Sequence, residues 1–112
     1  MRVAVIGSRS LTVDIARYIP GGTTEIITGG ARGIDSLAEK YADERYIPKL
    51  ILKPDYERSG NAAPLMRNRA IVEAADIVVA IWDGKSRGTW FCIEYAKKID
   101  KPVKVYILDG GA

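Results

Sequence analysis

The sequence has no histidine and only one cysteine, Cys92, among its 112 residues. A lone cysteine excludes an internal disulfide framework, and the missing histidines make a zinc site very unfavourable. The same absences remove Ser-His-Asp and Cys-His catalysis, so we expect no metal and no catalytic residue of those kinds. Because no base is evident beside it, Cys92 is predicted to be a small buried hydrophobic residue rather than a nucleophile.

Long hydrophobic runs are also missing from the chain. The longest one, Ile77 to Trp82, is far too short to cross a bilayer. The first residues, Met1 to Ala4, lack the charged and then apolar layout of a signal peptide. These features favour a cytoplasmic protein with no membrane partner.

The composition is that of an ordinary globular protein, with 47% hydrophobic and 28% charged residues. The length predicts one domain over residues 1–112. The net charge of +3 is modest, but basic residues gather where predicted strands give way to helices. This placement favours an anionic ligand, while a scattered solvated surface is the alternative. The residues concerned are Arg9, Arg32, Arg58, Arg67, Arg69, Lys85 and Arg87.

Hydrophobic periodicity predicts five strands alternating with four helices. The expected strands are Val3–Ile6, Glu25–Thr28, Lys49–Lys53, Asp76–Trp82 and Val103–Leu108. The expected helices are Leu11–Ile19, one that begins near Ile34, Ala62–Ala75 and Trp90–Ile99. This alternation is typical of an α/β fold, a three-layer Rossmann-like sandwich with a mostly parallel five-stranded sheet.

Details of three helices also follow from the pattern. The second helix is expected to begin with a capping box of Ser36 and Glu39, or with Asp35 as the cap. The third is expected to bury the side that carries Ala63, Met66, Ala70 and Ala74. The fourth is expected to bury the side that carries Cys92, Tyr95, Ala96 and Ile99.

Parallel sheets bind ligands outside the carboxyl ends of their strands, where the strand order reverses. Three loops are expected to meet at that edge: Gly7–Ser10, Gly29–Gly33 and Asp83–Thr89. Helix N-termini present free N–H groups, which phosphate can reach where glycine leaves out the Cβ. The candidate ligand-binding residues are Gly7, Ser8, Arg9, Gly29, Gly30, Arg32, Gly33, Arg67, Asn68, Arg69, Lys85, Ser86, Gly88 and Thr89.

Two of these assignments have structural alternatives. The glycines at 29, 30 and 33 could serve close packing between a strand and a helix. Arg69 could pair with Glu73 one helical turn away. Asp83 could bind a ribose hydroxyl or Mg²⁺, although a turn residue is the simpler interpretation.

Four elements in order resemble the SLOG superfamily: Gly7-Ser8-Arg9, Gly29–Asp35, Met66–Arg69 and Lys85–Thr89. The match is to its small stand-alone members, and that superfamily includes the DNA-processing protein A Rossmann domain and the Lonely Guy phosphoribohydrolases. The resemblance implies a Rossmann-like fold that binds nucleotides or nucleotide-derived ligands, often as a homodimer.

The resemblance does not extend to the catalytic glutamate of the Lonely Guy enzymes. Lonely Guy enzymes carry a Gly-Thr-x-x-Glu element whose glutamate is the acid-base residue, whereas this chain has Gly88-Thr89 followed by Cys92 at the glutamate position. We therefore expect a non-catalytic module that binds a nucleotide-like small molecule, with no certain cofactor. One alternative is cleavage of an N-glycosidic bond with a carboxylate from elsewhere, such as Asp83 or Asp35. The other is single-stranded DNA binding, in which Trp82 or Trp90 would stack on bases.

Overall fold

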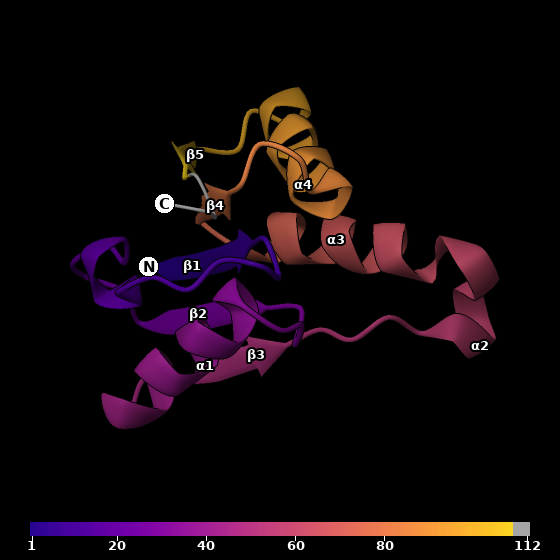
Figure 1. Ribbon diagram of the computed structural model, residues 1–112. Coiled ribbons are helices and arrows are strands. Elements are labelled where there is room, and N and C mark those ends of the chain that lie inside the picture. Colours follow the sequence, from indigo (N-terminus) through magenta and orange to yellow (C-terminus); the bar gives the residue numbers. More distant parts are fainter. Residues whose placement is uncertain (109–112) are drawn as a thin grey trace.

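A five-stranded parallel sheet with helices on both faces organises the molecule (Figure 1). The computed structural model describes residues 1–108, so the last four residues of the predicted domain lie outside the described part. The strand order is β3-β2-β1-β4-β5, and every neighbouring pair is parallel. The strands are β1 (Arg2–Gly7), β2 (Glu25–Thr28), β3 (Lys49–Ile51), β4 (Ile77–Trp82) and β5 (Val103–Ile107). The helices are η1 (Ile15–Arg17), α1 (Ile34–Glu44), α2 (Tyr56–Ser59), η2 (Gly60–Ala62), α3 (Ala63–Ala74) and α4 (Arg87–Lys98).

The predicted three-layer α/β fold is confirmed, and the central strand β1 illustrates it because both of its faces are covered. Val3 and Val5 point to one face, where they pack with α1 and with Leu11 of the first connection. Ala4 and Ile6 point to the other face and pack with α3 and α4. The next strand, β4, alternates in the same way, so both strands are apolar at successive positions because both of their faces are covered.

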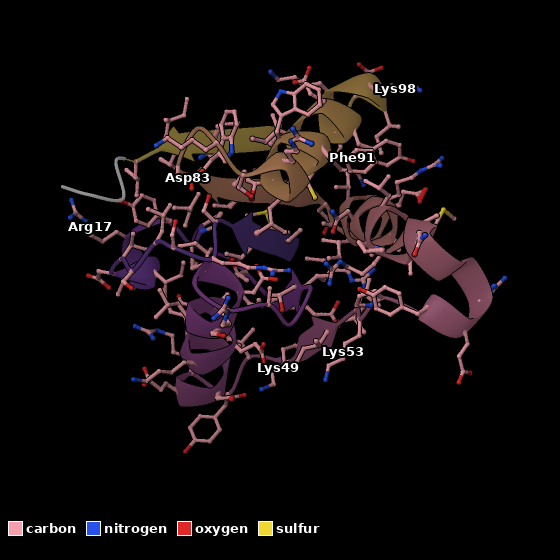
Figure 2. All side chains as sticks on the ribbon, turned by 45° about the vertical axis from the view of Figure 1, so that its right-hand side comes forward. Arg17, Lys49, Lys53, Asp83, Phe91 and Lys98 are labelled. Carbon is pink, nitrogen blue, oxygen red and sulfur yellow. The ribbon has the colours of Figure 1, made fainter. Side chains whose placement is uncertain are left out.

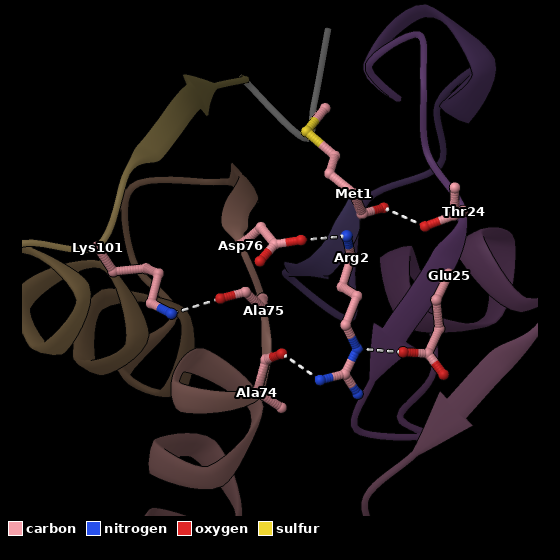
Figure 3. Close-up of polar contacts among 8 residues, drawn as sticks. All are labelled: Met1, Arg2, Thr24, Glu25, Ala74, Ala75, Asp76 and Lys101. Atoms are coloured by element: carbon pink, nitrogen blue, oxygen red, sulfur yellow. Dashed lines mark hydrogen bonds and ion pairs between the residues drawn. The ribbon is translucent and has the colours of Figure 1, made fainter.

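Polar contacts at the amino edge of the sheet fix the C-terminal end of α3 (Figure 3). The Arg2 guanidinium donates to the Ala74 carbonyl at 2.8 Å and pairs with Glu25 of β2. The Lys101 ammonium donates to the Ala75 carbonyl. Two cations thus satisfy carbonyls that the end of a helix leaves without partners, and they oppose its negative dipole end.

From this fixed end, α3 extends past the carboxyl edge of the sheet, and α2 lies beyond it (Figure 1). The chain after β3 runs out to α2. The N-cap of this helix is Asp55, whose carboxylate accepts from the Arg58 N–H at 3.1 Å. The first half of α3 therefore stands beside the ends of the strands, where the three predicted loops were expected. The sequence predicted only a loop in the region of α2.

The predicted helix over Leu11–Ile19 is wrong. Only the three-residue η1 forms there, and the preceding residue Asp14 has an extended backbone (φ −78°, ψ 92°). The β-branched Thr12 and Val13 disfavour a helix, and an extended course brings Leu11 and Ile15 into the core.

The expected buried side of α3 is only half right, because Ala63 is buried and Ala74 packs against the core, but the other two residues are exposed. Met66 is 49% exposed and Ala70 is exposed, whereas Ile71 and Val72 are buried. The side of the helix that faces the sheet is the one that buries the most apolar area. Ile71 and Val72 bury more apolar area than several alanines do. For α4 the expected Cys92 and Ala96 are buried together with Ile93, while Ile99 follows the end of the helix and is 38% exposed.

Candidate functional site

A cavity of about 360 Å³ opens at the carboxyl ends of β1 and β4. These two strands are neighbours in the sheet, with β2 and β3 on one side and β5 on the other, so this is where the strand order reverses. The cavity has the size of a small-molecule pocket, for which about 300 Å³ is the lower bound. Its lining residues are Ile6, Gly7, Arg9, Ser10, Gly29, Ala31, Asp35, Arg67, Asn68, Ile71, Asp83, Ser86, Gly88, Thr89 and Cys92.

The loop after β1 is held to the end of β4 by Ser8, which is 1% exposed. The Ser8 N–H donates to the Ile81 carbonyl at 3.1 Å, and its hydroxyl accepts from the Asp83 N–H at 3.0 Å. Ser8 therefore connects two loops and does not line the cavity. Its neighbours Arg9 and Ser10 are exposed and form part of the cavity wall.

The loop after β2 is organised by the carboxylate of Asp35. Its Oδ2 accepts from the Gly29 N–H at 3.0 Å and from the Ala31 N–H at 3.3 Å. The predicted capping box is therefore wrong, because Gly33 is the N-cap of α1, without a side-chain bond. Ser36 instead donates to the Ala31 carbonyl at 2.9 Å.

Asp35 is a buried carboxylate in the cavity wall, with 6% of its surface exposed. Burial raises its pKa above the ordinary 3.8, while the N–H groups of Ala31 and Gly29 and the charge of Arg67 act in the opposite direction. Burial has the largest effect because it penalises the charged form, so the proton is held more tightly than in an exposed aspartate.

Arg67 of α3 joins the ends of β2 and β3. Its Nη1 donates to the Gly29 carbonyl at 2.8 Å and to the Leu52 carbonyl at 3.4 Å, and its Nε donates to Asn68 Oδ1 at 2.8 Å. None of these bonds uses Nη2, which leaves donors of the guanidinium for a ligand in the cavity that Arg67 lines. The guanidinium is thus fixed in place before any ligand arrives.

The loop after β4 folds around Asp83, which lies on the carboxyl side of the sheet (Figure 2). Asp83 Oδ1 accepts from the N–H groups of Lys85 at 2.8 Å and Ser86 at 2.9 Å, and Oδ2 accepts from the Ser10 hydroxyl at 3.3 Å. The N–H groups of Ser86 and Lys85 are the main reason why the pKa of Asp83 lies below its ordinary value. Asp83 is therefore the turn residue that the simpler interpretation predicted.

The helix that follows, α4, begins directly at the cavity. Its N-cap, Ser86, makes no side-chain capping bond, and Ser86, Gly88 and Thr89 all line the cavity. The first N–H groups of a helix have no acceptor within the helix, and they carry partial positive charge. An anion in the cavity can therefore accept hydrogen bonds from the backbone at this point.

Protein atoms, rather than open space, face several of the glycines. A Cβ on Gly33 would lie 2.6 Å from the carbonyl oxygens of both Ser8 and Arg9, and Gly33 has φ +71°. A Cβ on Gly29 would lie 2.7 Å from Arg67 Nη1 and 3.1 Å from Asp35 Oδ2. These two glycines let neighbouring segments of the chain approach one another.

The structure brings eight of the fourteen predicted site residues together around the cavity. These are Gly7, Arg9, Gly29, Arg67, Asn68, Ser86, Gly88 and Thr89. The others, which do not line it, are Ser8, Gly30, Arg32, Gly33, Arg69 and Lys85. Arg69 is exposed on α3, with its guanidinium carbon 5.1 Å from the centre of the Tyr95 ring. Glu73, its suggested partner, accepts instead from the Tyr95 hydroxyl at 3.2 Å.

Cys92 and Asp35 line the cavity, although neither is among the predicted binding residues. Cys92 is 2% exposed, as predicted for a buried hydrophobic residue, and burial together with the nearby charge of Asp35 raises its pKa to about 12. From the sequence, Asp35, in the first turn after a glycine loop, is interpreted as a possible cap, and it is named as a functional carboxylate only in the alternative of N-glycosidic bond cleavage. The cavity at which basic residues were expected to bind an anion is therefore also lined by the carboxylates of Asp35 and Asp83.

Within residues 1–108, no group of three or more Cys, Asp or Glu side chains is arranged to hold a metal ion. No helix in the same part of the chain is long and apolar enough to cross a membrane.

Comparison with known proteins gives one informative relative. No protein-family profile matches this chain, and no solved structure matches it. The Gene 61 protein of Mycobacterium phage D29 is 34% identical over 84 residues, which span 70% of this chain and 67% of the phage protein. With that identity over two thirds of the phage protein, the chain belongs to the family of the D29 Gene 61 protein.

Proposed function

We propose that this protein binds a nucleotide or a nucleotide-derived ligand through its phosphate, at the carboxyl edge of the sheet. The observation that carries the proposal is the cavity at the β1–β4 switch point, walled by Arg9, Arg67 and the uncapped start of α4. Each charged hydrogen bond from an arginine contributes about 1.5–3 kcal/mol, against roughly 0.3–1 kcal/mol for the helix dipole. The two arginines therefore dominate the affinity for an anion.

The SLOG resemblance and the homodimer belong to the same proposal. The strand order β3-β2-β1-β4-β5 and the cavity at its switch point are compatible with a Rossmann-like nucleotide-binding domain. Exposed apolar side chains on α2 and α3, namely Tyr56, Leu65 and Met66, offer a surface for a second copy. Light scattering tests the dimer, which should have twice the 12.3 kDa mass of one chain.

Calorimetry and thermal shift with adenosine mono- and diphosphate, a cyclic nucleotide, ADP-ribose and NAD test the binding. A ligand at one hundred times its dissociation constant stabilises the fold by about 2.7 kcal/mol. Arg9→Gln should weaken binding of every phosphate-bearing probe by about tenfold or more, because it removes an exposed cation of the wall. Arg69→Gln is the matched control, since it removes the same charge from an exposed residue outside the cavity. If none of the probes stabilises the wild type, the proposal fails.

Asp35 favours a second candidate function, cleavage of an N-glycosidic bond. A buried carboxyl with a raised pKa in a ligand cavity is suited to proton transfer, and general acid-base groups contribute about 10²–10⁴ in rate. In such a reaction water adds to the sugar carbon, and the base leaves with a proton. Release of free base from nucleoside monophosphates by the wild type, and its loss in Asp35→Asn, are the expected results. No release by the wild type eliminates this candidate and leaves the binding proposal intact.

A further inference from the structure

Asp35 is a buried carboxyl group that has no ion-pair partner in the described part of the fold. It is 94% buried, and none of the ion pairs within 4.0 Å among residues 1–108 includes it. The charge of Arg67 is near enough to lower its pKa, yet the guanidinium is bonded to the carbonyls of Gly29 and Leu52. Burying a carboxylate is costly unless it is fully hydrogen-bonded or paired.

Only one oxygen of the carboxylate is used inside the protein. Oδ2 accepts from both Gly29 and Ala31, and neither bond involves Oδ1. Among residues 1–108, no buried side-chain oxygen or nitrogen lacks a hydrogen-bond partner. Oδ1 is therefore not sealed in the interior, and the surface that it can reach is the cavity that Asp35 lines.

The two carboxylate oxygens of Asp35 thus have different roles. The Oδ2 bonds fix the orientation of the side chain, and they hold Oδ1 as a preoriented acceptor at the cavity wall. An acceptor in a ligand cavity selects for a donor on the ligand, because a ligand without one leaves the acceptor unpaired. Asp35 repels the phosphate of the ligand, so the phosphate is expected beside Arg9 and the first N–H groups of α4. The carboxylate of Asp83, which also lines the cavity, is already hydrogen-bonded to Lys85, Ser86 and Ser10.

The size of the cavity indicates which donor meets Asp35. At about 360 Å³ it lies near the lower end of the range of ligand pockets, so it encloses the phosphate and the groups closest to it. In every nucleotide the group next to the phosphate is the sugar, whatever the base. We propose that Asp35 Oδ1 accepts a hydrogen bond from a sugar hydroxyl of the phosphate-bearing ligand, which makes Asp35 a determinant of ribose against deoxyribose. This inference rests on the proposed nucleotide binding.

Calorimetry with three probes tests it: adenosine monophosphate, its 2′-deoxy analogue and its 3′-deoxy analogue. The wild type should bind one or both deoxy analogues about 10- to 100-fold more weakly, the range expected for loss of a hydrogen bond to a charged group. In Asp35→Asn the amide oxygen can take over the bonds from Gly29 and Ala31, so the loop is retained while the charge is lost. Its ribose preference should fall to about two- to tenfold, as expected for a neutral partner.

Arg9→Gln is the control, because it should weaken all three nucleotides equally and leave the ratio of their affinities unchanged. Equal affinity of the wild type for the three nucleotides overturns the role of Asp35 while the nucleotide proposal stands. An unchanged ribose preference in folded Asp35→Asn also overturns it. If no nucleotide binds the wild type, both proposals fail together. The wild-type ratio decides the question even where the variant does not fold.

Discussion

Two loops of the site approach each other so closely at Gly33 that replacing it with alanine should strongly destabilise the protein. A positive φ costs a residue with a Cβ about 1–2 kcal/mol, and φ is +71° here. The new Cβ would also lie 2.6 Å from two carbonyl oxygens, and backbone shifts of that kind cost about 1–3 kcal/mol. The sum, roughly 2–5 kcal/mol, is a large fraction of the 5–15 kcal/mol typical of a domain.

Two other glycines separate these contributions. Gly22 has φ +83° with no atom within 4 Å of an added Cβ, so Gly22→Ala should show the backbone cost alone. Gly21 has neither a positive φ nor a neighbour within 4 Å, so Gly21→Ala should leave stability unchanged or raise it by up to about 1 kcal/mol. Urea unfolding followed by tryptophan fluorescence measures all three variants. Gly33→Ala should lower the midpoint by roughly 1–3 M relative to wild type. Equal midpoints for Gly33→Ala and Gly22→Ala would refute the close approach of the two loops.

Three further predictions concern Asp35, Lys101 and Cys92. Because the pKa of Asp35 in the folded protein lies above 3.8, the unfolded chain releases this proton first, and the contribution of Asp35 to stability declines as pH rises through that window. Asp35→Asn should therefore unfold at higher urea concentration than wild type at neutral pH, with the difference disappearing in acid; a constant difference contradicts this. Lys101→Met removes the hydrogen bond to the Ala75 carbonyl and should lower the free energy of unfolding, measured in a thermal melt, by about 1–2 kcal/mol. The control Lys98→Met changes an exposed lysine nearby and should lower it by less than about 0.5 kcal/mol. Since its pKa is raised to about 12, Cys92 should react with Ellman's reagent at neutral pH far more slowly than the same thiol in urea, and equal rates would contradict its burial.

The sheet was predictable because its strands carry a strong signal. Residues 77 to 82 are apolar at successive positions, which requires cover on both faces and therefore a central place in a parallel sheet. The meeting of three loops at one edge follows from that topology alone. The rotation of α3 was not predictable in this way, since its alanines and its Met66 make a stripe that competes with Ile71 and Val72.

The composition of the site was only partly accessible from the sequence. The glycines suggested room for a ligand, but a glycine that admits a phosphate and one that admits a neighbouring carbonyl look the same in a sequence. Gly33 is of the second kind, because the carbonyls of Ser8 and Arg9 come from a loop 24 or more residues earlier. Asp35 was interpreted as a possible cap or as the carboxylate of the alternative catalytic function, but not as a binding residue. Capping is a local pattern, whereas the contact of Asp35 with the cavity depends on α3 and β1, which are distant in the chain.

Ser8 links parts of the chain that are far apart in sequence. Its N–H donates to the Ile81 carbonyl, its hydroxyl accepts from the Asp83 N–H, and its carbonyl accepts from the Ile34 N–H at 3.5 Å. The chain entropy that such contacts cost grows with the loop that they close, and the contact with Asp83 spans 75 residues. A nascent or truncated chain that lacks β4 has no wall on which the pocket could close. A ligand that occupied this cavity would therefore bind only the complete fold, and by binding it would stabilise that fold against unfolding.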